Sequence, residues 1–208
     1  MNFLIIVPPN PNLGTQKNVT LTQQSPTFPK GCSYLSHSFI VFTVFTVYYS
    51  IMSVVLHFAT FLPFTTRSEV WKRINDWNGI NDEFWPFLHM TLPRGIQHTV
   101  DDISKDTLPL ISYISLFGIF PIDCHVFHSI HIEPENYLEE QSSNLQATFW
   151  KHKRQLIDHE GGIVVSDLIE FVPRVSFLQF IVKILFKAVF VWRHARLLLF
   201  FQQKHQTT

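Results

Sequence analysis

The side chains of this sequence that could do chemistry alternate along one short segment. Trp150, His152 and Arg154 occupy every second position, which places them on one face of a β-strand. Asp167 lies on the strand predicted to follow and Glu140 on the strand predicted to precede it. On a cavity wall, such a cluster could orient a ligand carbonyl or carboxylate beside an apolar tryptophan. A partly buried structural ion pair is the alternative interpretation.

Four strand-length segments with intervening turn residues must position this cluster. They predict successive antiparallel hairpins over residues 126–132, 137–143, 148–157 and 163–172. With a turn over residues 158–161, His152 is expected to face Asp167 directly across the last hairpin. Strand alternation then turns Lys151 and Lys153 to the opposite face.

The flanking segments predict an α+β domain. Residues 53–62 have the composition of a strand, and Thr66 with Glu69 has the form of a capping box that starts a short helix. A second short helix is expected over 80–88 with Asn81 or Asp82 as its cap, and a strand over 97–102. The chain should close with one long helix over 176–203.

The long helix is predicted to be amphipathic. At 100° per residue its broad apolar face comprises Phe177, Phe180, Ile181, Ile184, Leu185, Ala188, Val191, Trp192 and Ala195. The opposite, polar face comprises Gln179, Lys183, Lys187, Arg193 and His194. We expect the apolar face to pack on the sheet. A membrane span is the alternative, but Lys183 and Lys187 in mid-segment would be costly in hydrocarbon.

A series of short segments supports a family resemblance. In chain order these are 62–64, 69–71, 78–83, 90–93, 117–123, 140–143, 150–154, 167–174 and 192–197. The series resembles the START-like superfamily, also called SRPBCC, and in particular bacterial uncharacterised members related to the polyketide cyclase/dehydrase group. The resemblance implies a helix-grip fold, in which a bent antiparallel sheet wraps a long C-terminal helix, with two short helices after the first strand.

The resemblance also implies a cavity between sheet and helix that holds lipids, sterols, polyketides or similar molecules. Three functional hypotheses follow. The first is a non-enzymatic module that binds a hydrophobic small molecule through Trp150, His152, Arg154, Asp167 and Glu140. The second is a cyclase or dehydratase that uses His152 and Asp167 as acid/base groups. The third is a membrane-anchored lipid-binding protein. No hydrolase elbow, phosphate loop or zinc-protease motif occurs in the sequence, and no cofactor is expected.

The first 51 residues differ from the rest, since they contain Lys17 and Lys30 but no acidic residue. We expect 1–33 to be disordered because proline and polar residues dominate there. Residues 38–56 are uncharged and apolar, so they could contact or span a membrane, although the strand expected at 53–62 shortens the available length. We expect the domain to occupy 52–208, with 1–51 an extension or a mis-set start. A cytoplasmic location is expected, with membrane association through this segment as the alternative.

Charge and ligand spacing argue against two further functions. Sixteen Lys and Arg balance sixteen Asp and Glu, so the chain lacks the positive field that general nucleic-acid binding requires. His125, His128 and His131 recur every third residue, but on a strand 125 and 131 share one face and 128 takes the other, so no metal site is expected. Two cysteines far apart in the sequence favour a reducing compartment.

Overall fold

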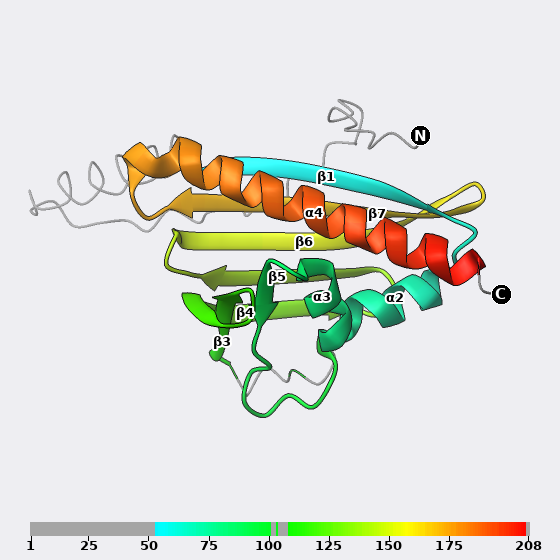
Figure 1. Ribbon diagram of the computed structural model, residues 1–208, viewed down its shortest axis with the longest axis horizontal. Coiled ribbons are helices and arrows are strands. Elements are labelled where there is room, and N and C mark those ends of the chain that lie inside the picture. Colours follow the sequence, from blue (N-terminus) through cyan, green and yellow to red (C-terminus); the bar gives the residue numbers. More distant parts are fainter. Residues whose placement is uncertain (1–52, 101–102, 104–107, 207–208) are drawn as a thin grey trace, which may run out of the picture. The chain divides into compact units, whose positions relative to one another are not determined.

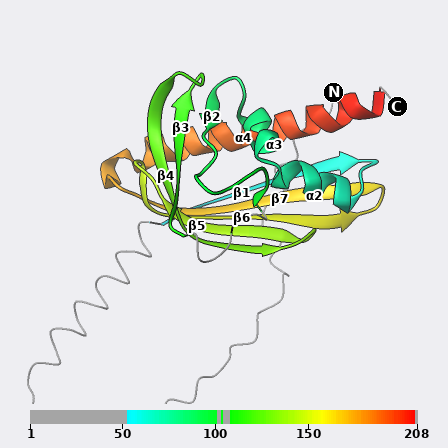
Figure 2. The ribbon, with the colours of Figure 1, turned by 90° about the horizontal axis from the view of Figure 1, so that it is seen from below.

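The described part of the chain, residues 53–100, 103 and 108–206 of this computed structural model, forms one curved sheet with helices on its concave side (Figures 1 and 2). In chain order the elements are β1 (Val54–Pro63), α2 (Arg67–Asn75), α3 (Trp77–Phe84), β2 (Leu88–Met90), β3 (Leu110–Leu116), β4 (Phe120–Glu133), β5 (Tyr137–Ser143), β6 (Ala147–His159), β7 (Gly162–Pro173), the short 3-10 helix η3 (Ser176–Leu178) and α4 (Gln179–Gln206). This arrangement confirms the predicted α+β helix-grip architecture.

The sheet has seven antiparallel strands in the order β1-β7-β6-β5-β4-β3-β2. The first strand therefore pairs with the last, and every other pairing joins neighbours in the chain. Register shifts interrupt the β3–β4, β4–β5 and β6–β7 pairings. Such bulges bend a strand and increase its twist, and Figure 2 shows the sheet curling so that β2 to β4 rise beside α4. The bend creates the hollow in which the site lies.

The strand predictions are confirmed for the hairpins of the site, with one correction in register. The structure has Arg154, rather than His152, directly opposite Asp167, and His152 opposite Ile169. The reason is a tighter turn than expected, because His159 already pairs with Gly162 across the hairpin. A shift of two residues leaves each side chain on its predicted face.

The connection from β1 to β2 agrees with the sequence at its start and departs from it later. Thr66 and Glu69 form the predicted capping box. The second helix, however, begins at Trp77 and is capped by Asp76, so Asn81 and Asp82 are not its cap. Gly79 lies inside this helix. A Cβ at this position would collide with the carbonyl oxygen of Arg73 on α2, so only glycine fits there. The glycine therefore allows the two helices to approach closely rather than ending the first one.

The segment between β2 and β3 was only partly predictable. Within the described residues of 97–102, Thr99 forms a single bridge to Asp76 and no strand is present. The apolar segment 108–117, whose type the sequence leaves open, contains β3.

Helix α4 packs on the sheet through a different face from the one predicted. Its buried residues are Val182, Phe186, Phe190, Arg193, His194, Leu197 and Phe201. Phe177 in η3 and Phe180 in α4 are 84% and 71% exposed, which contradicts the prediction that they pack inward. Apolar side chains occur almost all around this helix, so its sequence offers two apolar faces. Buried carboxylates on other elements decide between them by binding Arg193 and His194.

The predicted strand at 53–62 is confirmed as β1. Residues 1–52 lie outside the described part of the chain, and with them the expectations for 1–33, for most of 38–56 and for a domain start at Met52. Among the helices of residues 53–206, none combines the length and the apolar character that crossing a bilayer requires.

Candidate functional site

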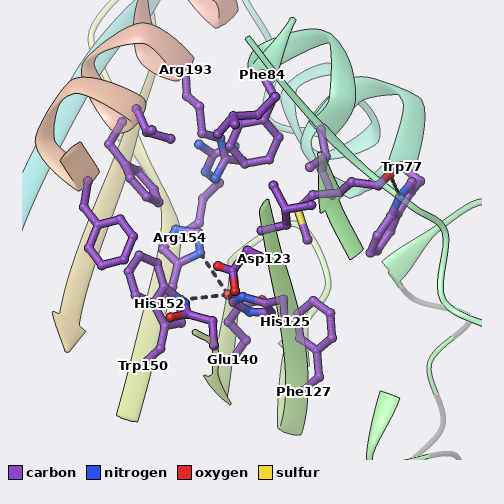
Figure 3. A pocket seen from close by; sticks show the side chains of 18 of the residues that line it. Trp77, Phe84, Asp123, His125, Phe127, Glu140, Trp150, His152, Arg154 and Arg193 are labelled. Atoms are coloured by element: carbon purple, nitrogen blue, oxygen red, sulfur yellow. Dashed lines mark hydrogen bonds and ion pairs between the residues drawn. The ribbon is translucent and has the colours of Figure 1, made fainter. Parts of the chain in front are cut away.

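A cavity of about 550 Å³ lies between the concave face of the sheet and the helices α3 and α4 (Figure 3). Its volume is within the range of small-molecule sites, roughly 300–1,000 Å³. Its wall comes from α2, α3, β2 to β6 and α4, and is mostly apolar. Large side chains in this wall include Trp77, Phe84, Met90, Phe127, Trp150 and Phe190. The fold therefore forms an apolar, partly open cavity large enough for an organic ligand.

Four of the five predicted site residues line this cavity. Glu140 projects from β5, and Trp150, His152 and Arg154 project from the same face of β6. Asp167 on β7 is completely buried and does not belong to the cavity wall. It lies behind His152 and Arg154, which it contacts directly. The structure therefore brings the five side chains together, with Asp167 behind the cavity wall.

The carboxylate of Asp167 binds three side chains. Arg154 donates two hydrogen bonds to it in a bidentate arrangement, from Nε at 2.8 Å and Nη2 at 2.7 Å. The Nε2 atoms of His152 and His194 lie 3.2 Å and 2.9 Å from its oxygens. His194 also contacts the hydroxyl of Thr60 on β1 at 2.8 Å. These bonds tie α4, β1, β6 and β7 together at one point.

A second buried carboxylate, Glu83 on α3, binds two arginines. Arg154 Nη1 lies 2.9 Å and 3.1 Å from its two oxygens, and Arg193 Nη2 lies 2.9 Å from Oε2. The guanidinium of Arg193 also lies over the ring of Phe84, 4.5 Å from its centroid. Arg154 thus bridges Glu83 and Asp167 and joins α3 to the sheet.

The buried carboxyl groups are held in their charged form. Burial alone would raise the pKa of Asp167, but the charge and hydrogen bonds of Arg154 and His152 lower it well below its ordinary value of 3.8. Burial likewise opposes ionisation of Glu83, and the neighbouring charges of Arg154 and Arg193 outweigh it, so the pKa of Glu83 is also lowered. The side chains of Asp167 and Glu83 are therefore negatively charged at neutral pH.

The histidine of the cavity wall lies between two carboxylates. Its Nε2 faces Asp167, and its Nδ1 lies 3.8 Å from Glu140 Oε1. Burial lowers the pKa of His152, but the charge and hydrogen bond of Asp167, together with the nearby Glu140 carboxylate, raise it above 6.5 overall. Burial raises the pKa of Glu140, and the imidazoles of His125 and His152, 3.6 Å and 3.8 Å away, lower it more strongly. The histidine and its carboxylates therefore stabilise each other's charges.

These pKa shifts predict a stability maximum in mildly acidic solution. The folded state binds carboxyl protons less tightly than the unfolded chain, so stability should fall as the pH drops below the ordinary glutamate pKa of 4.5. His152 acts oppositely: its contribution is complete below pH 6.5 and is lost as the pH rises through its raised folded pKa. Denaturant midpoints measured from pH 3 to pH 9 should therefore peak between pH 4.5 and 6.5. In His152→Phe the decline that begins above pH 6.5 should shrink, and an unchanged decline would contradict the assignment.

The three spaced histidines of β4 diverge, but not in the predicted way. His125 is buried in the cavity wall, whereas His128 and His131 are both exposed. Regular strand alternation predicted 125 and 131 on one face, but the register shift between Phe127 and Ser129 reverses the alternation after it. Within the described residues, no group of three or more potential ligands could hold a metal ion.

Sequence reasoning missed Glu83, His125, Arg193 and His194 as members of the site. Glu83 belongs to a short polar helix that resembles a solvent-exposed one. Arg193 and His194 were placed on the outer face of the long helix. A weak signal did exist: no acidic residue follows Glu170 in the chain, so cations on the last helix could find carboxylates only on other elements.

The cavity between a bent sheet and the long helix defines the class of protein: the chain has a START-like fold. The family model described as "Domain of unknown function (DUF8410)" matches residues 49–201. The chain therefore belongs to this family. No curated protein matches the sequence.

Solved structures confirm the START-like, or SRPBCC, fold. The aromatase/cyclase Zhui from Streptomyces sp. R1128 has a TM-score of 0.56 and 8% identity, covering 73% of this chain and 95% of that one. A START superfamily protein from Mycobacterium smegmatis has a TM-score of 0.53 and 8% identity, covering 72% and 97%. The di-domain ARO/CYC StfQ from the steffimycin biosynthetic pathway has a TM-score of 0.54 and 8% identity, covering 86% of this chain. The chain spans 63% of StfQ and 47% of DynU16 from the dynemicin biosynthetic locus.

Proposed function

We propose that this protein binds a hydrophobic small molecule, of the lipid or polyketide kind, in the cavity between its sheet and α4. The observation that carries the proposal is the apolar cavity of about 550 Å³ itself. Protein interiors are normally packed without voids larger than a water molecule. An apolar space of this size beside a packed core is therefore better explained by a ligand than by imperfect packing. The START-like fold supports the same proposal.

We place binding ahead of cyclase or dehydratase chemistry because of the surroundings of His152. A general base needs a free nitrogen within reach of the proton that it removes. Both ring nitrogens of His152 face carboxylates, Asp167 at 3.2 Å and Glu140 at 3.8 Å, and its pKa is raised. The residue is thus better suited to supporting the cavity wall than to exchanging protons with a ligand.

Filling the cavity should abolish ligand binding. Val189 on α4 lines the cavity and is partly buried, so Val189→Trp places an indole in the space a ligand would use. We expect this variant to weaken binding of the fluorescent apolar probe N-phenyl-1-naphthylamine by about tenfold or more, since the probe must displace the indole. The measurement is a fluorescence titration of the full chain.

The matched control is Ile184→Trp, which introduces the same side chain on the same helix. Ile184 is 51% exposed and does not line the cavity. This variant should bind the probe as the unmodified chain does. Equal affinity in both variants, with Val189→Trp folded by circular dichroism, would show that the probe binds elsewhere. Ile130→Trp fills the cavity from the sheet side and provides a second test if Val189→Trp fails to fold.

A further inference from the structure

We propose that the ligand of this cavity carries an uncharged oxygen group, a hydroxyl or a carbonyl, which His125 and Gln146 recognise, and that the cavity rejects ligands with a carboxylate. This inference rests on the proposed function and names the chemical class of its ligand.

The first observation is a pair of polar atoms without partners. Nε2 of His125 and Oε1 of Gln146 are both inaccessible to solvent and have no hydrogen-bond partner. Both residues line the cavity. The nearest charged group to His125 Nε2 is Oε1 of Glu140 at 3.6 Å, which exceeds the usual hydrogen-bond distance of roughly 2.7–3.2 Å. Because buried polar groups almost always find a partner, these two atoms point to a polar group supplied by the ligand.

The two residues belong to the same end of the cavity. His125 is on β4, and Gln146 is in the turn between β5 and β6. Asp123, two positions before His125, accepts a hydrogen bond from the backbone N–H of Leu145, next to Gln146, at 2.8 Å. Both polar atoms are covered in this structure, so a ligand group at this end meets them once the side chains turn toward the cavity. Figure 3 shows His125 beside Asp123 and Glu140 in the cavity wall.

The second observation concerns charge. Arg154 and Arg193, the arginines of the cavity wall, are both engaged by buried carboxylates. His152 is shared between Asp167 and Glu140. Within the described residues, the cavity wall thus contains no cation without a carboxylate partner. An anionic ligand would gain no ion pair there and would have to lose its hydration shell.

The surroundings of His125 make a carboxylate still less favourable. Glu140 lies 3.6 Å from its ring, and Asp123 is on the same strand face two residues away. A ligand carboxylate at this position would meet like charges, which repel it. A hydroxyl carries no charge, donates one hydrogen bond and accepts others. It can therefore donate to the amide oxygen of Gln146 and bond the imidazole of His125, while a ligand carbonyl can accept from the imidazole.

The test compares head groups on one alkyl chain. Dodecane, 1-dodecanol, dodecanoate and dodecylammonium, each below its aggregation concentration at pH 7.5, compete with N-phenyl-1-naphthylamine for the full chain. We expect 1-dodecanol to compete about tenfold or more better than dodecanoate, because its hydroxyl satisfies both unpartnered atoms. Dodecane should compete less well than 1-dodecanol.

Variants of His125 and Gln146 test whether these two residues produce the preference for 1-dodecanol. His125→Phe keeps a ring of similar size and removes the hydrogen-bonding atoms, so it should reduce the 1-dodecanol affinity about fivefold to tenfold and leave dodecane unchanged. Gln146→Leu should act in the same direction. The matched control is His128→Phe on the same strand, whose side chain is exposed and bonds Ser143. It should change neither affinity.

The outcomes separate this inference from the proposed function. Equal or tighter competition by dodecanoate or dodecylammonium would overturn the inference and leave hydrophobic binding intact. A folded His125→Phe variant that retains the preference for 1-dodecanol would also overturn the inference and leave hydrophobic binding intact. Absence of any probe binding by the unmodified chain would remove the proposed function, and this inference with it.

Discussion

Replacing Arg154 with methionine should lower the free energy of unfolding by about 3–5 kcal/mol, because it leaves two buried carboxylates without their shared cation. Arg154 binds both Asp167 and Glu83, whose side chains are 0% and 1% exposed. Methionine preserves much of the volume and removes the charge. Urea denaturation at pH 7, with the midpoint and slope of each variant, measures the loss.

The loss of stability caused by Arg154→Met should become smaller as the pH falls. Without Arg154, burial raises the pKa of the two carboxyl groups, so as the pH falls they take up protons and their uncompensated charge disappears. The difference in stability between the unmodified chain and Arg154→Met should therefore shrink in acid. Adding Asp167→Asn to the variant should restore part of the stability at pH 7, because it removes one of the two uncompensated charges.

Lys151→Met is the matched control, since Lys151 is on the same strand and faces the other way. Its ion pair with Glu139 spans 3.0 Å, and the two side chains are 35% and 25% exposed. Ion pairs of this kind contribute roughly 0–1 kcal/mol. Similar losses from the two substitutions would contradict a central role for Arg154 in the buried network.

The site strands could be predicted from the sequence because their information is local. Alternation at Trp150, His152 and Arg154 specifies a common face, and a hairpin brings Asp167 to that face in any register that differs from the predicted one by an even number of residues. The two-residue error in register therefore did no harm to the predicted cluster. For the same reason, the prediction for β5 coincides with the observed strand, Tyr137–Ser143.

The errors have a common physical cause, which is pairing over long sequence separations. Glu83 and Arg193 are 110 residues apart and meet only when α3 packs against α4. Nothing in the helical period of α4 tells its two apolar faces apart. The carboxylates of α3 and β7 select the face that contains Arg193 and His194. On β4, a bulge reversed the predicted side of His131, and bulges have no strong local signature.

The two halves of the site have different physical requirements. Arg154, Asp167 and Glu83 satisfy each other's hydrogen bonds and charges, so this half is complete without a ligand. His125 and Gln146 are incomplete without one. Substitutions in the first half should therefore act on stability, whereas substitutions in the second should act on affinity.

Trp150 lines the cavity and packs against α4, and Trp150→Ala should lower the free energy of unfolding by about 3–5 kcal/mol, the usual cost of deleting a buried aromatic side chain. The indole is 5% exposed, and its ring centroid lies 4.7 Å from that of Phe186 on α4 and 6.1 Å from that of Phe171 on β7. It therefore supports the contact between the helix and the sheet. Urea denaturation measures the loss of stability. Titration with N-phenyl-1-naphthylamine in the same samples measures whether the cavity, which the substitution enlarges, still binds the probe.

Trp150→Phe separates packing from hydrogen bonding. The phenyl ring retains part of the aromatic packing and loses the bond from Nε1 to Glu140, which spans 3.1 Å. We expect a loss of about 1.5–3 kcal/mol for a bond to a charged group. Tyr113→Ala, at a side chain 55% exposed on β3, controls for removal of an aromatic residue and should cost about 1 kcal/mol or less. If Trp150→Ala cost no more than Tyr113→Ala, packing of the indole would not support the contact between helix and sheet.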